Sequence, residues 1–123
     1  MPAYAKILVS DAERAAGFYE LLGFTRVQQD PIFVHLRWAR GADLFLVAMP
    51  PGASLAGPRG LGVILCFDAS GDLALETIAA RATAAGATVD GPREQPWHTR
   101  EVLVTDLDGY RVAFVEPGGA PLL

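Results

Sequence analysis

The chain has 123 residues, of which 51% are hydrophobic and 20% are charged, and this predicts one compact globular domain with a real core. Its formal net charge is −4 and no run of basic residues occurs, so we expect no nucleic-acid partner and favour a neutral or cationic one. No apolar run approaches the length of a membrane span and the single cysteine cannot form an internal disulfide, so we expect a cytoplasmic protein with no membrane contact.

The first half of the chain predicts a strand, a helix and three more strands. Segment 4–10 has the composition of a strand, and Ser10 followed by Glu13 has the capping-box pattern of a helix start. Apolar residues then recur at helical spacing before Gly23, namely Ala15, Phe18, Tyr19 and Leu22. Further strands are predicted over residues 24–29, 32–38 and 43–49, parted by turns at Asp30-Pro31 and Arg40-Gly41.

The second half repeats this order after a connector rich in Pro and Gly. The segment 61–67 predicts a strand, and Asp72 is the expected N-cap of a helix that ends near Gly86. The apolar stripe of this helix consists of Leu75, Ile78, Ala79, Ala82 and Ala85. Strands follow over residues 87–91, 100–106 and 110–116, the last two joined as a hairpin through "DLDG".

The two halves also match in sequence, because "GADLFLVAMPPG" from Gly41 and "GYRVAFVEPGG" from Gly109 each run turn, apolar strand, Pro and Gly. We therefore expect a single α+β domain made of two modules, at about 1–50 and about 61–117, with a linker over 51–60. One helix covers only one face of each module's sheet, so the other face has to be buried by the second half, a partner chain or a ligand. Function is expected on that concave face.

The segments "VSDAERAAGFYELLGF" and "VTDLDGYRVAFVEP" resemble the vicinal oxygen chelate superfamily, and the resemblance extends over nearly the whole chain. That family includes glyoxalase I, extradiol dioxygenases, fosfomycin-modifying enzymes and the metal-free bleomycin resistance proteins. The resemblance implies two βαβββ modules whose curved mixed sheets surround a concave cavity, in a homodimer that can exchange strands. It does not by itself select one activity.

The family's enzymes hold a metal with His or Glu side chains on the first strand of each half and on the final strand. Alignment places Tyr4 at the first of these positions, Gly62 or Leu61 at the second, and Ala113 at the third. Glu116 lies three residues after Ala113 and so points to the opposite face of its strand. Because these residues offer no imidazole or carboxylate, we expect no metal, no other cofactor and no catalytic residue, which favours a protein that is not an enzyme.

The segment "EQPWHTRE" is most similar to the bleomycin resistance proteins, which bind their drug reversibly in grooves of the dimer and do not alter it. The resemblance implies that Trp97 lines such a groove and that Phe33 belongs to the facing wall. The chain departs from the pattern at His98, where Gly is usual, and at Gln28, where a second wall aromatic is expected. The ligand therefore need not be bleomycin itself.

The set of residues that we expect to contact a ligand is Tyr4, Phe33, His35, Trp38, Trp97, His98, Arg100 and Glu101. For Trp97, stacking on a flat ligand and plugging a dimer interface or the core are equally compatible with the sequence. Arg100 and Glu101 either reach the groove or pair with each other. His35 and His98 are wall residues in preference to a metal pair.

Strand parity adds further expectations about this face. Phe33, His35 and Arg37 share one face of their strand, while Val34, Leu36 and Trp38 share the other, which would pack on the first helix. Parity also places Tyr4, Lys6, Arg111 and Ala113 on the floor of the concave face. Cys66 lies in the apolar run "VILCF" and is expected to be a buried, inert thiol.

These observations favour a homodimeric binding protein that sequesters an aromatic or cationic small molecule of the bleomycin type, with Asp30 and Glu101 assisting a cationic ligand. The alternative is a lyase or isomerase, similar to a glyoxalase or a dioxygenase, with altered metal ligands or with a His that acts without a metal. A third and weaker alternative is a structural or regulatory dimer with no ligand.

Overall fold

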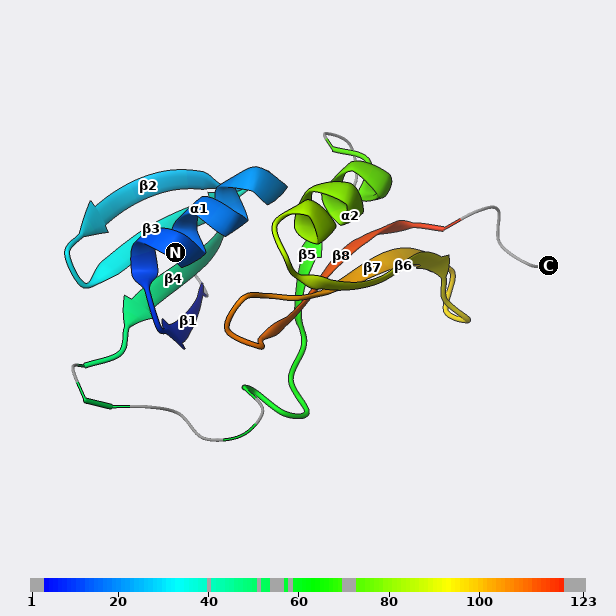
Figure 1. The fold of residues 1–123 in the computed structure, drawn as a ribbon. Coiled ribbons are helices and arrows are strands. Elements are labelled where there is room, and N and C mark those ends of the chain that lie inside the picture. The colour runs from blue at the N-terminus through cyan, green and yellow to red at the C-terminus, as the bar shows by residue number, and fades with distance from the viewer. Residues whose placement is uncertain are drawn as a thin grey trace. The chain divides into compact units, whose positions relative to one another are not determined.

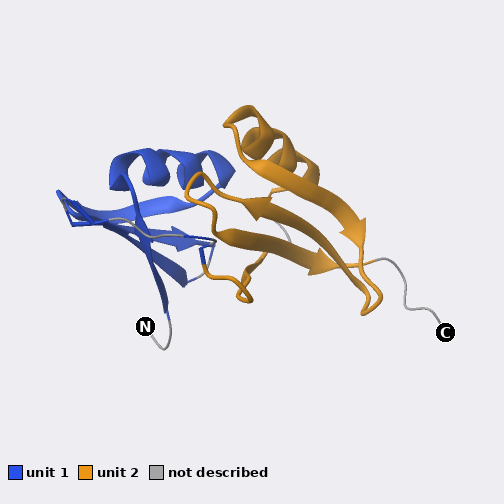
Figure 2. Ribbon diagram, turned by 60° about the horizontal axis from the view of Figure 1, so that its bottom comes forward, with its two compact units in different colours: residues 1–59 blue, residues 60–123 orange. Residues whose placement is uncertain are grey.

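The computed structural model describes residues 4–39, 41–50, 52–53, 57, 59–69 and 73–118. The chain forms two compact units, unit 1 over residues 1–59 and unit 2 over residues 60–123, coloured separately in Figure 2. Each unit has one helix and one four-stranded sheet. No helix in the described ranges is long and apolar enough to cross a membrane.

Unit 1 consists of β1 (Tyr4–Val9), α1 (Ala12–Leu22), β2 (Thr25–Asp30), β3 (Phe33–Trp38) and β4 (Ala42–Ala48). Its strands are ordered β1-β4-β3-β2. Strands β1 and β4 are parallel, whereas β3 is antiparallel to both of its neighbours. Helix α1 covers one face of this sheet (Figure 1). We call that side the helix face and the other side the open face.

Unit 2 has the same plan. It consists of β5 (Leu65–Asp68), α2 (Leu75–Ala84), β6 (Thr88–Glu94), β7 (Thr99–Thr105) and β8 (Arg111–Pro117), with the strand order β5-β8-β7-β6. Strands β5 and β8 are parallel and the other pairs are antiparallel. Helix α2 packs on one face, so this sheet too has a helix face and an open face (Figure 1). The predicted α+β class and the doubled βαβββ order are confirmed.

The internal repeat also holds in the backbone. Gly41 and Gly109 both have positive φ, at 121° and 95°, so each supplies the left-handed turn before the last strand of its unit. After these turns, Leu44 and Leu46 of β4 are fully buried, as are Val112 and Phe114 of β8. Residues of β4 and β8 that follow their turn glycine by the same number of positions therefore correspond, beginning with Asp43 and Arg111.

Both helix starts differ from the sequence prediction. Helix α1 is capped by Asp11 rather than Ser10, because the Asp11 side chain accepts a hydrogen bond from the Arg14 backbone N–H at 3.1 Å. Helix α2 begins after Ala74, which makes no capping bond through its side chain, and Asp72 lies outside the described residues. Strand β5 is also shorter than predicted, since it starts at Leu65 instead of Leu61.

The core of unit 1 explains where Trp38 lies. Val34, Leu36 and Trp38 are all buried on the helix face of β3, as strand parity predicts. The Trp38 ring lies 5.1 Å from the ring of Phe24, which in turn lies 5.2 Å from Tyr19 of α1. Trp38 is therefore a core residue of unit 1, only 6% exposed.

Candidate functional site

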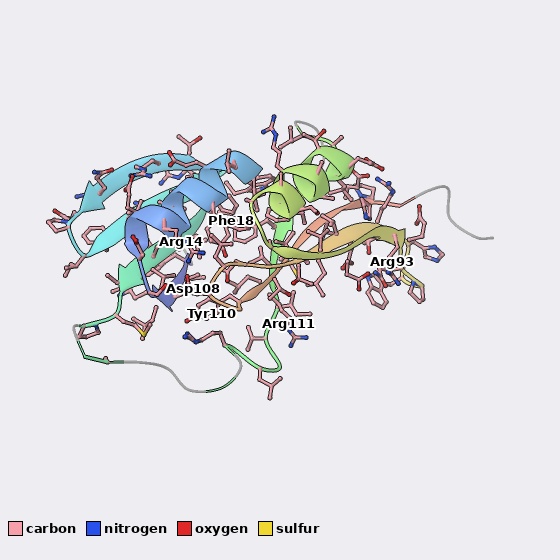
Figure 3. The ribbon with its side chains drawn as sticks, in the orientation of Figure 1. Arg14, Phe18, Arg93, Asp108, Tyr110 and Arg111 are labelled. Atoms are coloured by element: carbon pink, nitrogen blue, oxygen red, sulfur yellow. The ribbon has the colours of Figure 1, made fainter. Side chains whose placement is uncertain are left out.

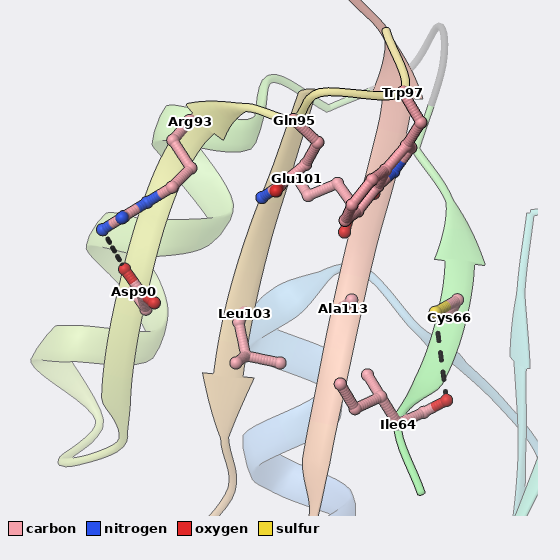
Figure 4. Close-up of a pocket in the computed structure, with 9 residues that line it drawn as sticks. All are labelled: Ile64, Cys66, Asp90, Arg93, Gln95, Trp97, Glu101, Leu103 and Ala113. Carbon is pink, nitrogen blue, oxygen red and sulfur yellow. Dashed lines mark hydrogen bonds and ion pairs between the residues drawn. The ribbon is translucent and has the colours of Figure 1, made fainter. Parts of the chain in front are cut away.

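A cavity lies entirely within unit 2, on the open face of its sheet (Figure 4). Its volume is about 450 Å³, within the range of small-molecule sites. We call it the open-face pocket. It is lined by Ile64, Cys66, Asp90, Arg93, Gln95, Trp97, Glu101, Leu103 and Ala113.

The floor of the open-face pocket follows from the strand register. Cys66 of β5, Ala113 of β8, Leu103 of β7 and Asp90 of β6 lie side by side in one row across the sheet. Side chains in one row point to the same face, so all four point away from α2. A methyl group at Ala113 in the middle of the row leaves the face hollow. The polar groups are confined to the β6 and β7 side.

A bulge in β6 gives the pocket its charged wall. Asp90 pairs with Leu103 while Arg93 pairs with Glu101, so two residues of β6, Gly91 and Pro92, oppose the single residue Val102 of β7. Without the bulge, Asp90 and Arg93 would lie on opposite faces of the strand. With it, both reach the pocket and form an ion pair with each other, and Figure 3 shows Arg93 near the ends of β6 and β7.

The bulge requires glycine at position 91. Gly91 has φ of +100°, and a Cβ atom there would lie 2.8 Å from the backbone oxygen of Glu101. No Cβ atom tolerates so short an approach to a backbone oxygen, and this φ is unfavourable for other residues. Gly91 thus allows β6 to lie close to the strand that carries Glu101.

The β6–β7 turn carries Trp97, and its backbone conformation explains why Gly is usual at position 98. The turn is closed by hydrogen bonds from His98 N–H to Gln95 O at 3.0 Å and from Gln95 N–H to Thr99 O at 2.8 Å. Short hairpin loops of this kind commonly end in a left-handed residue, and His98 has φ of +68°. The His98 side chain is exposed and does not line the pocket.

Glu101 holds the indole of Trp97 at the pocket. One carboxylate oxygen of Glu101 accepts hydrogen bonds from Trp97 Nε1–H at 3.0 Å and from the Thr99 hydroxyl at 2.7 Å. The Trp97 side chain remains 63% exposed (Figure 4). Both donors are neutral, and among the described residues no cation bonds this carboxylate. Glu101 therefore contributes a negative charge that a ligand can neutralise.

Cys66 lies at the surface of the pocket, which corrects the expectation of a buried thiol. It is the second of the four residues of edge strand β5, and its side chain is exposed on the open face. Partial burial, together with the nearby charge of Glu101, raises the pKa of the Cys66 thiol. At neutral pH the side chain is therefore a neutral thiol, a weak nucleophile and a soft apolar part of the floor.

Arg100 lies on the opposite side of the sheet from the pocket. It bonds Glu116 of β8 at 3.1 Å and also forms an ion pair with Glu76 of α2, so it fastens the helix to the sheet. These carboxylates raise the pKa of Arg100, that of Glu76 first, and Arg100 lowers the pKa of Glu76. Arg100 and Glu101 do not pair with each other, and only Glu101 lines the pocket.

The predicted contact residues of unit 1 gather on the open face of the other sheet. The ring of Phe45 lies 4.9 Å from Tyr4, 6.3 Å from Phe33 and 4.2 Å from His35, on which it stacks. Trp38 is on the helix face and has no part in this cluster. Asp30 lies apart, in a small polar cleft with Glu13 and Gln29.

His35 belongs to a buried polar group that the sequence did not reveal. Asp43, whose side chain is 2% exposed, bonds Arg37 Nε at 2.8 Å and His35 Nε2 at 3.0 Å. The hydrogen bond from Arg37, and then that from His35, hold the pKa of Asp43 below its usual range, so the carboxylate is ionised at neutral pH. An ionised carboxylate only accepts, so His35 donates from Nε2.

The metal positions of related enzymes are not matched by donors in this structure. Because Tyr4 opposes Asp43 and the equivalent residue of β8 is Arg111, the counterpart of Tyr4 in unit 2 is Ile64, not Gly62. Ile64 and Ala113 carry no donor atom, and Glu116 bonds Arg100 instead. Within the described residues no three His, Cys, Asp or Glu side chains group so as to hold a metal ion. The residues present do not fit a metal at this site.

The family is now settled by comparison with known proteins. A model of the Glyoxalase/Bleomycin resistance protein/Dioxygenase superfamily matches residues 2–114. The chain belongs to this superfamily. No curated protein matches it. The resemblance of the helix and hairpin segments to this group is therefore confirmed over nearly the whole chain.

Solved structures of the same superfamily share the fold. A glyoxalase/bleomycin resistance protein/dioxygenase family enzyme from Burkholderia phytofirmans PsJN is 21% identical, with a TM-score of 0.74 over 93% of this chain and 96% of that one. A bleomycin-binding protein complexed with bleomycin is 21% identical, with a TM-score of 0.69 over 94% and 98%. A glyoxalase/bleomycin resistance protein from Streptomyces sp. CB03234 is 27% identical, with a TM-score of 0.66 over 91% and 98%.

Proposed function

We propose that this chain is a binding protein of the superfamily that sequesters an aromatic, cationic small molecule of the bleomycin type without a metal, as a means of drug resistance. The observation that carries the proposal is the open-face pocket, in which an exposed indole and a carboxylate without a counter-ion stand over a floor where no three metal-binding side chains of the described residues come together. Pockets of this kind bind by burying apolar surface and fix orientation with a few polar groups.

Each part of the pocket has a role in this proposal. A flat group of the ligand would stack on the indole of Trp97, which adds about 1 kcal/mol beyond the buried area. The Leu103 and Ala113 side chains would cover its apolar edge. Its cationic or N–H group would lie at Glu101, whose charge no cation of the described chain matches. Asp90 is already paired with Arg93 and contributes less.

The open face of unit 1 supplies the second part of the proposal. Tyr4, Phe33 and His35 form an aromatic surface around Phe45, and Tyr4 is 53% exposed. We propose that this surface takes part in ligand contact or in pairing with a second copy, since the bleomycin type of site requires a homodimer. Trp38 and Arg100 are left out of the proposed contacts because their side chains lie on the helix faces, and His98 is left out because it does not line the open-face pocket.

Titration with bleomycin under tryptophan fluorescence tests the proposal. The chain has two tryptophans, and they give a matched pair of variants. In Trp38→Phe only the exposed Trp97 emits, and ligand at micromolar concentration should quench most of its emission. In Trp97→Phe only the buried Trp38 emits, and quenching should disappear. Equal quenching in both variants contradicts the proposal. So does a wild type that shows no quenching up to about 1 mM ligand, because a dissociation constant of that size corresponds to a binding free energy of only about 4 kcal/mol.

Elemental analysis separates binding from the enzymatic alternative. Protein purified without a chelator should contain no stoichiometric transition metal. One equivalent of metal that is lost on substitution of His35 or His98 would instead support a lyase or isomerase with altered ligands.

A further inference from the structure

A second cavity of unit 2 adjoins the open-face pocket and has no role in the function proposed above. It has a volume of about 310 Å³ and lies where β5 and β8 run parallel. Its apolar lining comes mainly from Phe67, Val115 and Pro117. We call it the β5–β8 cavity.

Two observations join the β5–β8 cavity to the open-face pocket. Cys66 lines both, so the cavities meet at its exposed thiol. Thr99 lines the β5–β8 cavity and donates to Glu101, which lines the open-face pocket and also accepts from Trp97. The hydrogen-bonded series from Thr99 through Glu101 to Trp97 thus runs from one cavity to the other.

Strand parity places the shared lining on one face. Val115 and Glu101 oppose each other across β8 and β7, and Ala113 and Leu103 form the next row on the same face. Val115 therefore lies on the same face as the floor of the open-face pocket, one row further along β8, and lines the β5–β8 cavity only. Among the described residues Trp97 makes one side-chain hydrogen bond, to Glu101, and it is 63% exposed, so its indole can shift at small cost.

We propose that the two cavities are subsites of one elongated site, and that the ligand has two flat or apolar parts joined end to end. The first part, carrying the positive charge, occupies the open-face pocket at Glu101. The second is mainly apolar, because the lining is mostly apolar and, of its two carboxylates, Asp68 and Glu116, the latter is already paired with Arg100. The link between the two parts passes the Cys66 thiol. This inference rests on the proposed function and specifies the shape of its ligand.

Two commercial dyes test the proposal by calorimetry. Thioflavin T has a flat benzothiazolium cation joined to an uncharged aryl group, and 2,3-dimethylbenzothiazolium is the cationic half alone. With the wild-type chain, thioflavin T should bind at least about tenfold more tightly, since a second subsite adds buried apolar contact. Equal affinities of the two dyes would overturn the two-part site while leaving the proposed function intact.

Matched variants locate the second part. Val115→Phe fills only the β5–β8 cavity and should weaken thioflavin T by about tenfold without changing the affinity of the smaller dye. Leu103→Phe fills only the open-face pocket and should weaken both dyes.

Circular dichroism checks the fold, and Val115→Met repeats the test with a more adaptable side chain if the Phe variant unfolds. A Val115→Phe or Val115→Met chain that folds and binds thioflavin T as the wild type does would overturn the inference. Failure of the wild type to bind either dye would overturn the cationic ligand class, and with it this inference.

Discussion

Where β4 of unit 1 carries Phe45, β8 of unit 2 carries Ala113, and the neighbours of these two residues differ in the same direction. Phe45 lies between Lys6 and His35, whereas Ala113 lies between Cys66 and Leu103. The large ring fills the open face of unit 1, and the methyl group leaves a pocket in unit 2. One backbone plan thus supports a filled face and a hollow face, and the side chain in the central row decides which.

The polar groups of the two open faces differ as well. In unit 1 the carboxylate of Asp43 is buried and satisfied by Arg37 and His35. In unit 2 the carboxylate of Glu101 is held by neutral donors at the edge of a cavity. A buried carboxylate that is already bonded by its own chain is not available to a ligand, while one without a counter-ion is. The open face of unit 2 is therefore the better candidate for a ligand site.

The largest expected effect on the stability and ligand binding of unit 2 comes from Gly91→Ala. The added Cβ would meet the Glu101 backbone oxygen at 2.8 Å, and the φ of +100° would be strained in addition. We expect a loss of about 3 kcal/mol in the free energy of unfolding, measured by urea denaturation, and loss of ligand binding. Gly86→Ala is the control, because Gly86 has φ of +96° with no atom within 4 Å. It should cost only about 1 kcal/mol. Equal losses would show that the close approach of β6 and β7 is not what matters.

Exchanging the central side chains tests the comparison directly. Ala113→Phe should fill the open-face pocket and abolish bleomycin binding, while the unfolding free energy stays within about 1 kcal/mol, because the ring enters existing space. Phe45→Ala should cost about 2 kcal/mol, since it removes the contacts to Tyr4 and His35 from a half-buried ring. A ligand that binds Ala113→Phe as well as the wild type would place the site elsewhere.

The sequence alone predicted the order of elements and which strand residues face the helices. Periodicity is enough for this, because Val34, Leu36 and Trp38 follow a period of two and α1 a period of 3.6. Trp38, one of the predicted ligand contacts, follows the same parity and lies in the core. Side-chain direction is therefore a stronger guide to this site than residue type.

The pocket was harder to predict because it depends on register and on a bulge. The letters "TVDGPRE" alone do not reveal that Asp90 and Arg93 share a face, because this depends on a register in which two residues of β6 oppose one of β7. Cys66 appeared buried because its run is apolar, but its strand is at the edge of the sheet and the open face reaches it. The signal that was available is Gly91-Pro92 inside a strand, a pattern typical of a bulge.

The smallest effect is expected from removing the charge of Asp43, which tests whether the filled face is held by its buried ion pair. Asp43→Asn loses a charged acceptor for Arg37 and His35 and should lower the unfolding free energy by about 1 kcal/mol at pH 7. Because the folded-state pKa of Asp43 is lowered, its stabilisation is complete above the pKa of the unfolded chain and is lost as the pH falls through the folded value. The difference between wild type and variant should therefore shrink on acidification in urea denaturation. Asp30→Asn, an exposed change on the same sheet, is the control and should leave the unfolding free energy unchanged both at pH 7 and at acidic pH. If the loss of unfolding free energy in Asp43→Asn does not change with pH, that would contradict an ionised, buried carboxylate.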